Sequence, residues 1–193
     1  MKKLFFCLLL LNSQYLKSQS LNWYEGSVVL VSNKVLTGKI SIEPIHDIIL
    51  LQEGDLRTVY PAHKIQSLYF YDGTANINRR FISVKMEDER QAHCALFEIV
   101  LQGEVMLLRR QKIKAFSLSD ALDFTYHVKL KKELVPLSKF NRKIYPQLVS
   151  LNDTRLEDFV SKNRLGAIND VNSIRIIEFY NSLIRSDDVI AMH

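Results

Sequence analysis

The sequence predicts an α+β fold, in which an antiparallel β-rich sandwich or small barrel is followed by a short helical C-terminal region. Between residues 21 and 137, short runs of β-branched, aromatic and aliphatic residues alternate with turn residues at spacings of roughly ten residues. Beyond Pro136 the apolar residues recur at helical spacing. We therefore expect an antiparallel β-rich domain over 21–137 and C-terminal helices over 138–193 packed on it.

Residues 1–20 have the features of a signal peptide. Two lysines precede an unbroken apolar run over 4–11, and Ser18 and Ser20 suit a signal peptidase. The alternative is a membrane anchor, which needs about 20 apolar residues to cross a bilayer, and this run is far shorter. Cys7 lies inside the run, behind two phenylalanines, which argues against lipidation. We expect cleavage, no transmembrane span in the mature chain, and a periplasmic or extracellular location, with outer-membrane association left open.

Cysteine content and charge narrow the class of protein. After cleavage only Cys94 remains, so no internal disulfide is expected, which fits a bacterial envelope protein. We interpret Cys94 as a small buried core residue. Residues 101–150 hold 10 Lys and Arg against 4 Asp and Glu, whereas the flanking regions are mildly acidic. This basic block favours an anionic partner, such as an acidic glycan, a lipid headgroup or an acidic protein surface, and an exported protein is not expected to bind nucleic acid.

The β-rich part divides into short strands separated by turn residues. Residues 32–34 and 53–55 mark two turns, and Pro61 precedes a further strand. Residues 124–130 alternate in polarity, as a half-buried strand does. The expected strands cover 27–31, 35–42, 47–52, 56–60, 64–71, 81–86, 95–101, 105–110, 124–130 and 134–137.

The stretch 95–110 predicts a β-hairpin at the centre of this domain. Both arms are rich in β-branched, aromatic and large aliphatic residues, and Gln102-Gly103-Glu104 forms the bend. Phe97, Ile99 and Leu101 share one face of the first arm, while Leu96 and Val100 make the other face apolar as well. A strand that is apolar on both faces is usually central and covered on both sides.

Two polar stretches contain the candidate partner-binding residues. The first is the loop after Tyr71, because loops carry function more often than strands do. The second is the basic stretch that follows the hairpin. The alternative for the loop is a solvated connector, and the alternative for the basic residues is a solvated face whose charges oppose strand-to-strand aggregation. The candidates are Asn76, Asn78, Arg79 and Arg80 in the loop, and Arg109, Arg110, Lys112, Lys114, Lys131 and Lys132 in the basic stretch.

Three short amphipathic helices are expected after the β-rich part. The first is short or broken, because Pro146 interrupts its pattern. The second starts at a capping box formed by Thr154 and Glu157. Asp170 can cap the third helix. The apolar stripe of this third helix consists of Val171, Ile174, Ile177, Tyr180 and Ile184.

Motifs that carry catalytic chemistry are absent from the sequence. The five histidines share no metal-ligand spacing, and no cysteine pair accompanies them. The six glycines stand singly, so there is no phosphate-binding loop or dinucleotide fingerprint, and no serine lies in a nucleophile elbow. We therefore predict no catalytic, cofactor-binding or metal-binding residues, and no cofactor. A hydrolase-like enzyme with a site assembled from distant residues stays open as an alternative.

Residues 26–71 resemble a small five-stranded barrel of the SH3-like or Sm-like type. The resemblance rests on the strand 28–30, on Leu36-Thr37-Gly38-Lys39-Ile40 and on the later strand 65–70. It implies a fold and little about function, because such barrels host many functions.

The mature chain as a whole resembles uncharacterised exported proteins of Bacteroidota. This resemblance implies an envelope location and brings no known activity or site residues with it. It rests on the signal peptide, on residues 23–30, on Phe70-Tyr71-Asp72 with Arg79 and Phe81, on Glu98 and Gly103 in the hairpin, and on Tyr180-Asn181.

These observations predict a non-catalytic secreted or periplasmic cell-envelope protein. Export, a β-rich build and missing catalytic motifs favour a binding or interaction module for an envelope protein or for an anionic glycan or lipid surface. Besides an enzyme, the other alternative is a structural homo-oligomer that assembles through the helical tail. The sequence leaves the oligomeric state open.

Overall fold

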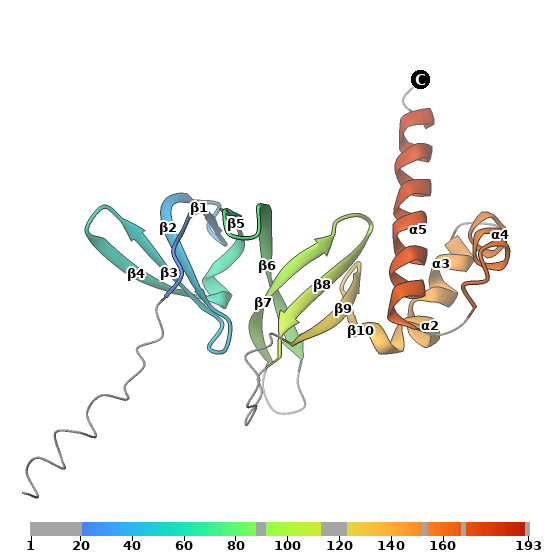
Figure 1. Ribbon diagram of the computed structural model, residues 1–193, viewed down its shortest axis with the longest axis horizontal. Coiled ribbons are helices and arrows are strands. Elements are labelled where there is room, and N and C mark those ends of the chain that lie inside the picture. Colours follow the sequence, from blue (N-terminus) through green and yellow to red (C-terminus); the bar gives the residue numbers. More distant parts are fainter. Residues whose placement is uncertain (1–20, 88–91, 113–122, 152–153, 167–168, 192–193) are drawn as a thin grey trace, which may run out of the picture.

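The computed structural model describes residues 21–87, 92–112, 123–151, 154–166 and 169–191 (Figure 1). The expected signal peptide lies outside the described residues. In the described part, ten strands form one antiparallel sheet, and α-helices follow at the C-terminal end. The strands are β1 (Tyr24–Leu30), β2 (Val35–Glu43), β3 (Ile48–Glu53), β4 (Leu56–Pro61), β5 (Ile65–Asp72), β6 (Ile77–Glu87), β7 (Ala92–Leu101), β8 (Val105–Gln111), β9 (Phe124–Leu130) and β10 (Glu133–Pro136).

The sheet is open and has the strand order β10-β9-β8-β7-β6-β5-β1-β2-β3-β4. The α+β class and the antiparallel β-rich region are confirmed, but a single open sheet replaces the predicted sandwich or small barrel. The reason lies at β5, which pairs with β1 on one side and with β6 on the other. A barrel of the first five strands would close between β4 and β5, and β6 already occupies that edge of β5. The resemblance to SH3-like and Sm-like barrels stays a prediction.

The predicted central hairpin is present. β7 and β8 are its arms, and both lie inside the sheet with partners on each side. Ala95, Leu96 and Phe97 are all buried, although successive strand residues point to opposite faces. Both faces of β7 are therefore covered, as its apolar pattern indicates.

The segment before the hairpin differs from the expected polar loop. β6 begins at Ile77, earlier than the predicted Phe81, so Asn78, Arg79 and Arg80 lie in a strand. Asn76 remains in the turn before it and adopts a left-handed conformation, with φ of 55°. Asn and Arg are not typical strand residues, but here they pair in register with the end of β5. As strand neighbours, Arg79 and Arg80 point to opposite faces of the sheet.

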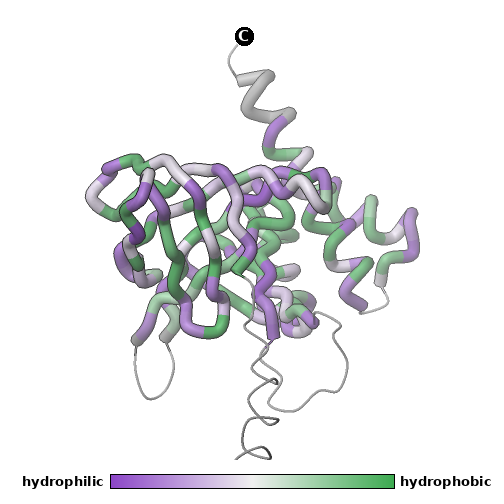
Figure 2. The backbone as a smooth tube through the Cα atoms, turned by 60° about the vertical axis from the view of Figure 1, so that its left-hand side comes forward, coloured by the Kyte–Doolittle hydropathy of each residue, from purple (hydrophilic) through white to green (hydrophobic). Residues whose placement is uncertain are grey.

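Three apolar clusters lie along the sheet. One gathers side chains of β1 to β5 together with Leu96 of β7. A second holds Val84, Phe97 and Leu108, on the opposite face of β6, β7 and β8. The third joins β8, β9 and β10 to the helices. Figure 1 shows the strands β1 to β5, then β6 to β8, then β9, β10 and the helices, one after another along the long axis. Figure 2 shows apolar residues in the strands and in the helices next to them.

The sheet bends so that its first strands come close to its central hairpin. The turn between β2 and β3 reaches β7, because the Asp47 carboxylate accepts a hydrogen bond from the backbone N–H of Leu96 at 2.8 Å. The same turn is tied to the 3₁₀ turn η2 (Ala62–Lys64), since the N–H of Ala62 donates to the carbonyl of Asp47 at 2.8 Å. Leu96 can therefore join the core of β1 to β5.

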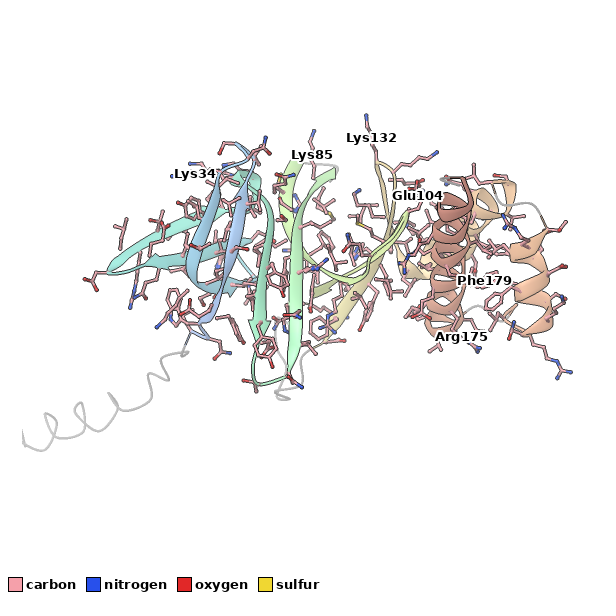
Figure 3. The ribbon with its side chains drawn as sticks, turned by 90° about the horizontal axis from the view of Figure 1, so that it is seen from above. Lys34, Lys85, Glu104, Lys132, Arg175 and Phe179 are labelled. Carbon is pink, nitrogen blue, oxygen red and sulfur yellow. The ribbon has the colours of Figure 1, made fainter. Side chains whose placement is uncertain are left out.

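The helices are α2 (Phe140–Lys143), α3 (Tyr145–Leu151), α4 (Arg155–Lys162) and α5 (Asp170–Ala191). The predicted break at Pro146 is confirmed: α2 ends before it, and the proline sits in the first turn of α3, where its missing N–H costs nothing. Phe179 of α5 points toward α4 (Figure 3), and its ring stacks on that of Phe159 at 3.8 Å between centroids. No helix in the described residues is long and apolar enough to cross a membrane.

The starts of the last two helices are predicted correctly, but their caps are not. Thr154 precedes α4 with near-helical backbone angles, and its side chain makes no capping hydrogen bond. At α5 the cap is Asn169 and not Asp170, because the N–H of Asn172 donates to the Asn169 side-chain oxygen at 2.7 Å. In both cases the predicted residue is of a type that can cap a helix. The backbone conformation at the helix start determines whether its side chain does so.

Asn181 of α5 fixes the bend of the central hairpin. Its side-chain oxygen accepts from the N–H of Val105 at 3.0 Å, and its amide donates to the carbonyl of Val105 at 2.8 Å. Gly103 lies directly beneath this amide, since a Cβ atom there would stand 2.3 Å from the Asn181 Cγ. The close approach of the Asn181 side chain to residue 103 therefore requires glycine there, whatever the type of turn.

Candidate functional site

A pocket of about 730 Å³ lies over the face of the sheet between the start of the described chain and β9. One part of its wall comes from residues 21–24 and from the end of β2 with the turn after it. The other part comes from β5, β6, β7, β8 and the start of β9. Its lining residues are Leu21, Asn22, Tyr24, Ser41, Ile42, Glu43, Pro44, Ile45, Phe70, Asp72, Arg79, Phe81, Leu96, Glu98, Arg109, Arg110, Gln111 and Phe124.

Four charged side chains form a chain of ion pairs on the pocket wall, which we call the charge ladder: Asp72, Arg79, Glu98 and Arg109. The Nε of Arg79 donates to Asp72 at 2.8 Å, and its Nη1 donates to Glu98 at 2.7 Å. Arg109 holds Glu98 with two bonds, from Nε at 2.7 Å and from Nη2 at 3.0 Å. Both carboxylates are buried, with Asp72 5% and Glu98 8% exposed.

The antiparallel register explains why these four residues meet. They come from four neighbouring strands, β5, β6, β7 and β8, and they alternate in sign from each strand to the next. Glu98 lies directly opposite Arg109, while Phe81, two residues after Arg79, lies opposite Glu98. Cross-strand neighbours on one face are close enough for side chains to pair. The ladder is therefore a product of register, which joins residues far apart in sequence.

The contacts of the ladder favour the ionised forms of Asp72, Arg79 and Arg109. The pKa of Asp72 lies below its usual value, mainly because the Arg79 side chain donates to its carboxylate, although burial acts in the opposite direction. Burial by itself would lower the pKa of Arg79, but the bonds and charges of Asp72 and Glu98 outweigh it and raise this pKa. The hydrogen bonds to Glu98 likewise raise the pKa of Arg109. None of these three groups exchanges a proton readily near neutral pH.

An aromatic wall stands next to the ladder. The ring of Tyr24 stacks on Phe70 at 4.5 Å between centroids, and Phe70 stacks on Phe81 at 5.8 Å. At the other end, the guanidinium of Arg109 lies over the ring of Phe124, 4.5 Å from its centroid. Flat apolar surfaces therefore flank the charged groups on two sides, so the pocket is amphipathic.

Asp47 bonds to Arg110, a lining residue of the pocket, without lining the pocket itself. One of its carboxylate oxygens accepts from Arg110 Nη2 at 2.6 Å, and the other accepts the N–H of Leu96 noted above. Asp47 has a left-handed backbone, with φ of 53°, at the turn between β2 and β3. This turn also carries Pro44 and Ile45, which line the pocket. The Asp47 contacts therefore position one side of the pocket mouth against the hairpin.

Of the nine predicted site residues in the described part of the chain, only three line the pocket. Arg79, Arg109 and Arg110 do so, and each is bonded to a carboxylate. A partner-binding role for the ten residues stays a prediction. The structure shows, however, that the charges of these three arginines are already compensated, so they differ from the free cations that a basic block suggests.

The loop residues other than Arg79 lie on the opposite face of the sheet or at its end. Arg80 donates to the Gln102 side chain at 2.9 Å and lies over the ring of Tyr69. The hydroxyl of Tyr69 donates to Asn78 at 2.7 Å, and the hydroxyl of Tyr71 donates to Asn76. These contacts form an exposed polar and aromatic strip that is separate from the pocket.

Of the remaining basic candidates, Lys112, Lys131 and Lys132 do not line the pocket. Lys112 is exposed and is 4.0 Å from Asp123, and Lys114 lies outside the described residues. Lys131 has a left-handed backbone at the turn between β9 and β10, with φ of 54°. Figure 3 shows Lys132 pointing outward from this turn, toward the same side as Lys34 and Lys85.

Sequence reasoning missed the residues that build the pocket. Asp72 reads as a turn residue beside Gly73, Glu98 reads as part of the hairpin, and both otherwise appear only among the residues that carry the resemblance to exported proteins. One signal was available: Glu98 is a single charge between Phe97 and Ile99 in a strand that is apolar on both faces. A carboxylate at such a position needs a buried partner, and this requirement indicates an arginine on a neighbouring strand.

A second hollow, of about 400 Å³, lies beside η2. Its lining includes His46, His63, His93 and Cys94, which come from three separate segments. The structure nevertheless contains no group of three or more His, Cys, Asp or Glu placed to hold a metal ion in the described part of the chain. Cys94 is half-buried and packs against the core of β1 to β5.

Comparisons with protein-family models, with curated proteins and with solved structures found no match to this chain. The assignment of the pocket as the candidate site therefore rests on its own geometry. Three features support it: its size, the buried charge ladder in its wall, and the aromatic surfaces on either side of that ladder.

Proposed function

We propose that the protein is a non-catalytic secreted or periplasmic cell-envelope protein that acts as a binding module, with the pocket as its recognition site. The observation that carries the proposal is the pocket itself. Its volume of about 730 Å³ falls within the range of about 300–1,000 Å³ typical of ligand sites. Its wall combines apolar surface with a few well-positioned polar groups, as ligand sites generally do.

The pKa values of the ionisable groups in the pocket favour binding over catalysis. A general acid or base works best when its pKa lies near the working pH. In this pocket the pKa of Asp72 is pushed lower, and the pKa values of Arg79 and Arg109 are pushed higher. The described lining contains no histidine or cysteine that could serve instead. These groups are suited to holding a ligand rather than to transferring protons.

The pairing of the arginines also changes how a partner would be bound. A long-range attraction of anions needs uncompensated positive charge. Arg79, Arg109 and Arg110 each have a carboxylate within 2.8 Å. Recognition therefore depends on shape and on short-range hydrogen bonds, and less on the net charge of residues 101–150. The proposed envelope location rests on the sequence: on the signal-like segment 1–20, on the single remaining cysteine and on the resemblance to exported proteins.

A matched pair of variants tests whether the pocket binds ligands. Ile45 and Val59 are both about half exposed, at 48% and 53%, but only Ile45 lines the pocket. Mature protein would be screened by thermal shift against envelope lipids, glycans and short peptides, and hits would be measured by calorimetry. We expect Ile45→Lys to weaken a hit about tenfold or more and Val59→Lys to leave it unchanged. Equal effects of both variants, or no hit at all, would contradict the proposal.

A further inference from the structure

The chemistry of the ligand can be narrowed from the charges around the pocket. Three arginines line it, Arg79, Arg109 and Arg110, and three carboxylates line it as well, from Glu43, Asp72 and Glu98. Asp47, bonded to Arg110, adds one further negative charge. The site therefore has no net positive charge with which to offset the desolvation of an anionic ligand. An uncharged ligand avoids this penalty.

Hydrogen-bonding capacity gives the second constraint. A guanidinium has five N–H donors, and the bonds of Arg79 to the ladder carboxylates use two of them. Glu98 accepts three N–H bonds from the two arginines, and Asp72 accepts one from Arg79 and two from the backbone N–H groups of Thr74 and Ala75. A carboxylate has about four acceptor sites, so both are nearly saturated. The charge ladder thus offers a ligand mainly donors.

The apolar wall gives the third constraint. Tyr24, Phe70 and Phe81 form a continuous stack next to the ladder. At the mouth, Leu21 is 43% exposed and Ile45 is 48% exposed, although both are large apolar side chains. An apolar chain lying along this wall would cover the aromatic stack and the exposed side chains of Leu21 and Ile45. Exposed apolar patches of this kind commonly mark binding sites.

Building on the proposed function, we infer that the ligand of this pocket is an uncharged single-chain amphiphile, with its apolar chain against Tyr24, Phe70 and Ile45 and with ester or hydroxyl oxygens of its head accepting hydrogen bonds from Arg79 and Arg109. An uncharged head with several oxygen acceptors matches donors that are already charge-compensated. A chain of methylene groups matches the aromatic wall and the rim.

Three probes with the same chain length and different head charge test this inference: monolaurin, laurate and dodecylamine. Each would be titrated into the mature protein by calorimetry below its micelle concentration. We expect monolaurin to bind about tenfold or more tightly than either charged probe, and Ile45→Lys to abolish its binding. Equal or tighter binding of laurate or dodecylamine would overturn the inference.

A charge variant of the rim sharpens the test. Glu43→Gln removes one of the three lining carboxylates, so the affinity for laurate should rise relative to that for monolaurin. Glu53→Gln is the matched control, because Glu53 is exposed at the end of β3 and does not line the pocket. An unchanged ratio in Glu43→Gln would overturn the charge argument.

If the screen finds pocket ligands but monolaurin is not among them, this inference fails while the proposed function stands. If nothing binds, the proposed function fails as well.

Discussion

The two ends of β8 use the same face of the same strand in opposite ways. Val105 and Leu107 point into the core under the helices and are fully buried. Arg109, two residues further along, lies on that face too, but it lines the pocket and pairs with Glu98. The strand changes from an apolar core to a charged site where the helices stop covering it.

This comparison shows what a covering layer demands of a sheet. Where the helices cover this face, the sheet side chains that join the core are apolar. Water is excluded there, so a charged side chain would lack both solvent and an ionic partner. Beyond the helices water reaches the face, and four charges can stay there provided that each has a partner. A ladder of this kind is weak as a source of stability, because apolar side chains of similar size often stabilise a fold equally well. Its place in the pocket wall agrees with the proposed binding function.

The largest effect is expected at the covered end. Leu107→Ala removes a fully buried side chain between the sheet and the helices, and we expect a loss of about 4 kcal/mol in the free energy of unfolding. Val59→Ala, on the exposed edge strand β4, should change stability by less than about 0.5 kcal/mol. Urea denaturation of both variants measures the difference. A small loss in Leu107→Ala would mean that the helices do not bury this face.

At the pocket end, we expect Glu98→Ala to cost about 3 kcal/mol, because it leaves Arg79 and Arg109 half-buried without their shared carboxylate. The triple variant Arg79→Met, Glu98→Leu, Arg109→Met should recover most of this stability while losing ligand binding. Chemical denaturation and calorimetry of the same samples separate the two effects. If the triple variant is as unstable as Glu98→Ala, the ladder is a structural element of the sheet and not a binding device.

At the covered end, the Asn181 amide joins α5 to the hairpin, and its removal should have an intermediate effect. Asn181→Ala leaves the N–H and the carbonyl of Val105 without their buried partners, so we expect a loss of about 2 kcal/mol. Hydrogen exchange of the Val105 amide should accelerate with it. Ser182→Ala, next in the chain and exposed, is the control and should have little effect. Unchanged exchange at Val105 would show that α5 does not hold the hairpin.

Most of the fold follows from local patterns in the sequence. The hairpin at 95–110, the strand rhythm before it and the break at Pro146 all arise from spacing of apolar and turn residues, which short-range rules describe well. The open sheet does not follow from them. It depends on whether β5 pairs with β4 or with β6, and both partners have similar patterns, so only long-range pairing decides.

The site was much harder to predict than the fold. Arg79 is a candidate because of the expected loop and Arg109 because of the basic stretch, but their partners Asp72 and Glu98 are not among the candidates. The ladder joins residues whose positions relative to one another depend on strand order and register. A one-residue change of register would send all of these side chains to the opposite face. Sequence patterns alone do not fix register across four strands.

A smaller effect is expected from pH, on the face opposite to the ladder. The pKa of His127 lies below its ordinary value of 6.5, because its ring is buried and Arg110 lies nearby. Its ring makes an edge contact with Phe97 at 5.2 Å between centroids. The folded state therefore favours neutral histidine, and stability should fall as the pH drops below about 6.5, by at most about 1.4 kcal/mol per pH unit.

Replacing this histidine isolates its contribution. His127→Leu should flatten the dependence of stability on pH below about pH 6.5, since the neutral form of His127 is the one that the fold favours. Denaturation curves at a series of pH values provide the measurement. If the wild type and the variant lose stability in parallel over this range, the acid sensitivity comes from other groups.

The smallest effect is expected at Arg80, and it tests which face of the sheet carries the site. Arg80 follows Arg79 in β6 but points away from the pocket, where it contacts the exposed Gln102 and Tyr69. Because this contact is open to water, Arg80→Ala should change stability by less than about 0.5 kcal/mol and leave ligand affinity unchanged. Arg79→Ala should reduce both, since it removes the link between Asp72 and Glu98. If Arg80→Ala instead weakened binding and Arg79→Ala did not, recognition would belong to the strip formed by Tyr69, Tyr71 and the two asparagines, and the charge ladder would serve the fold alone.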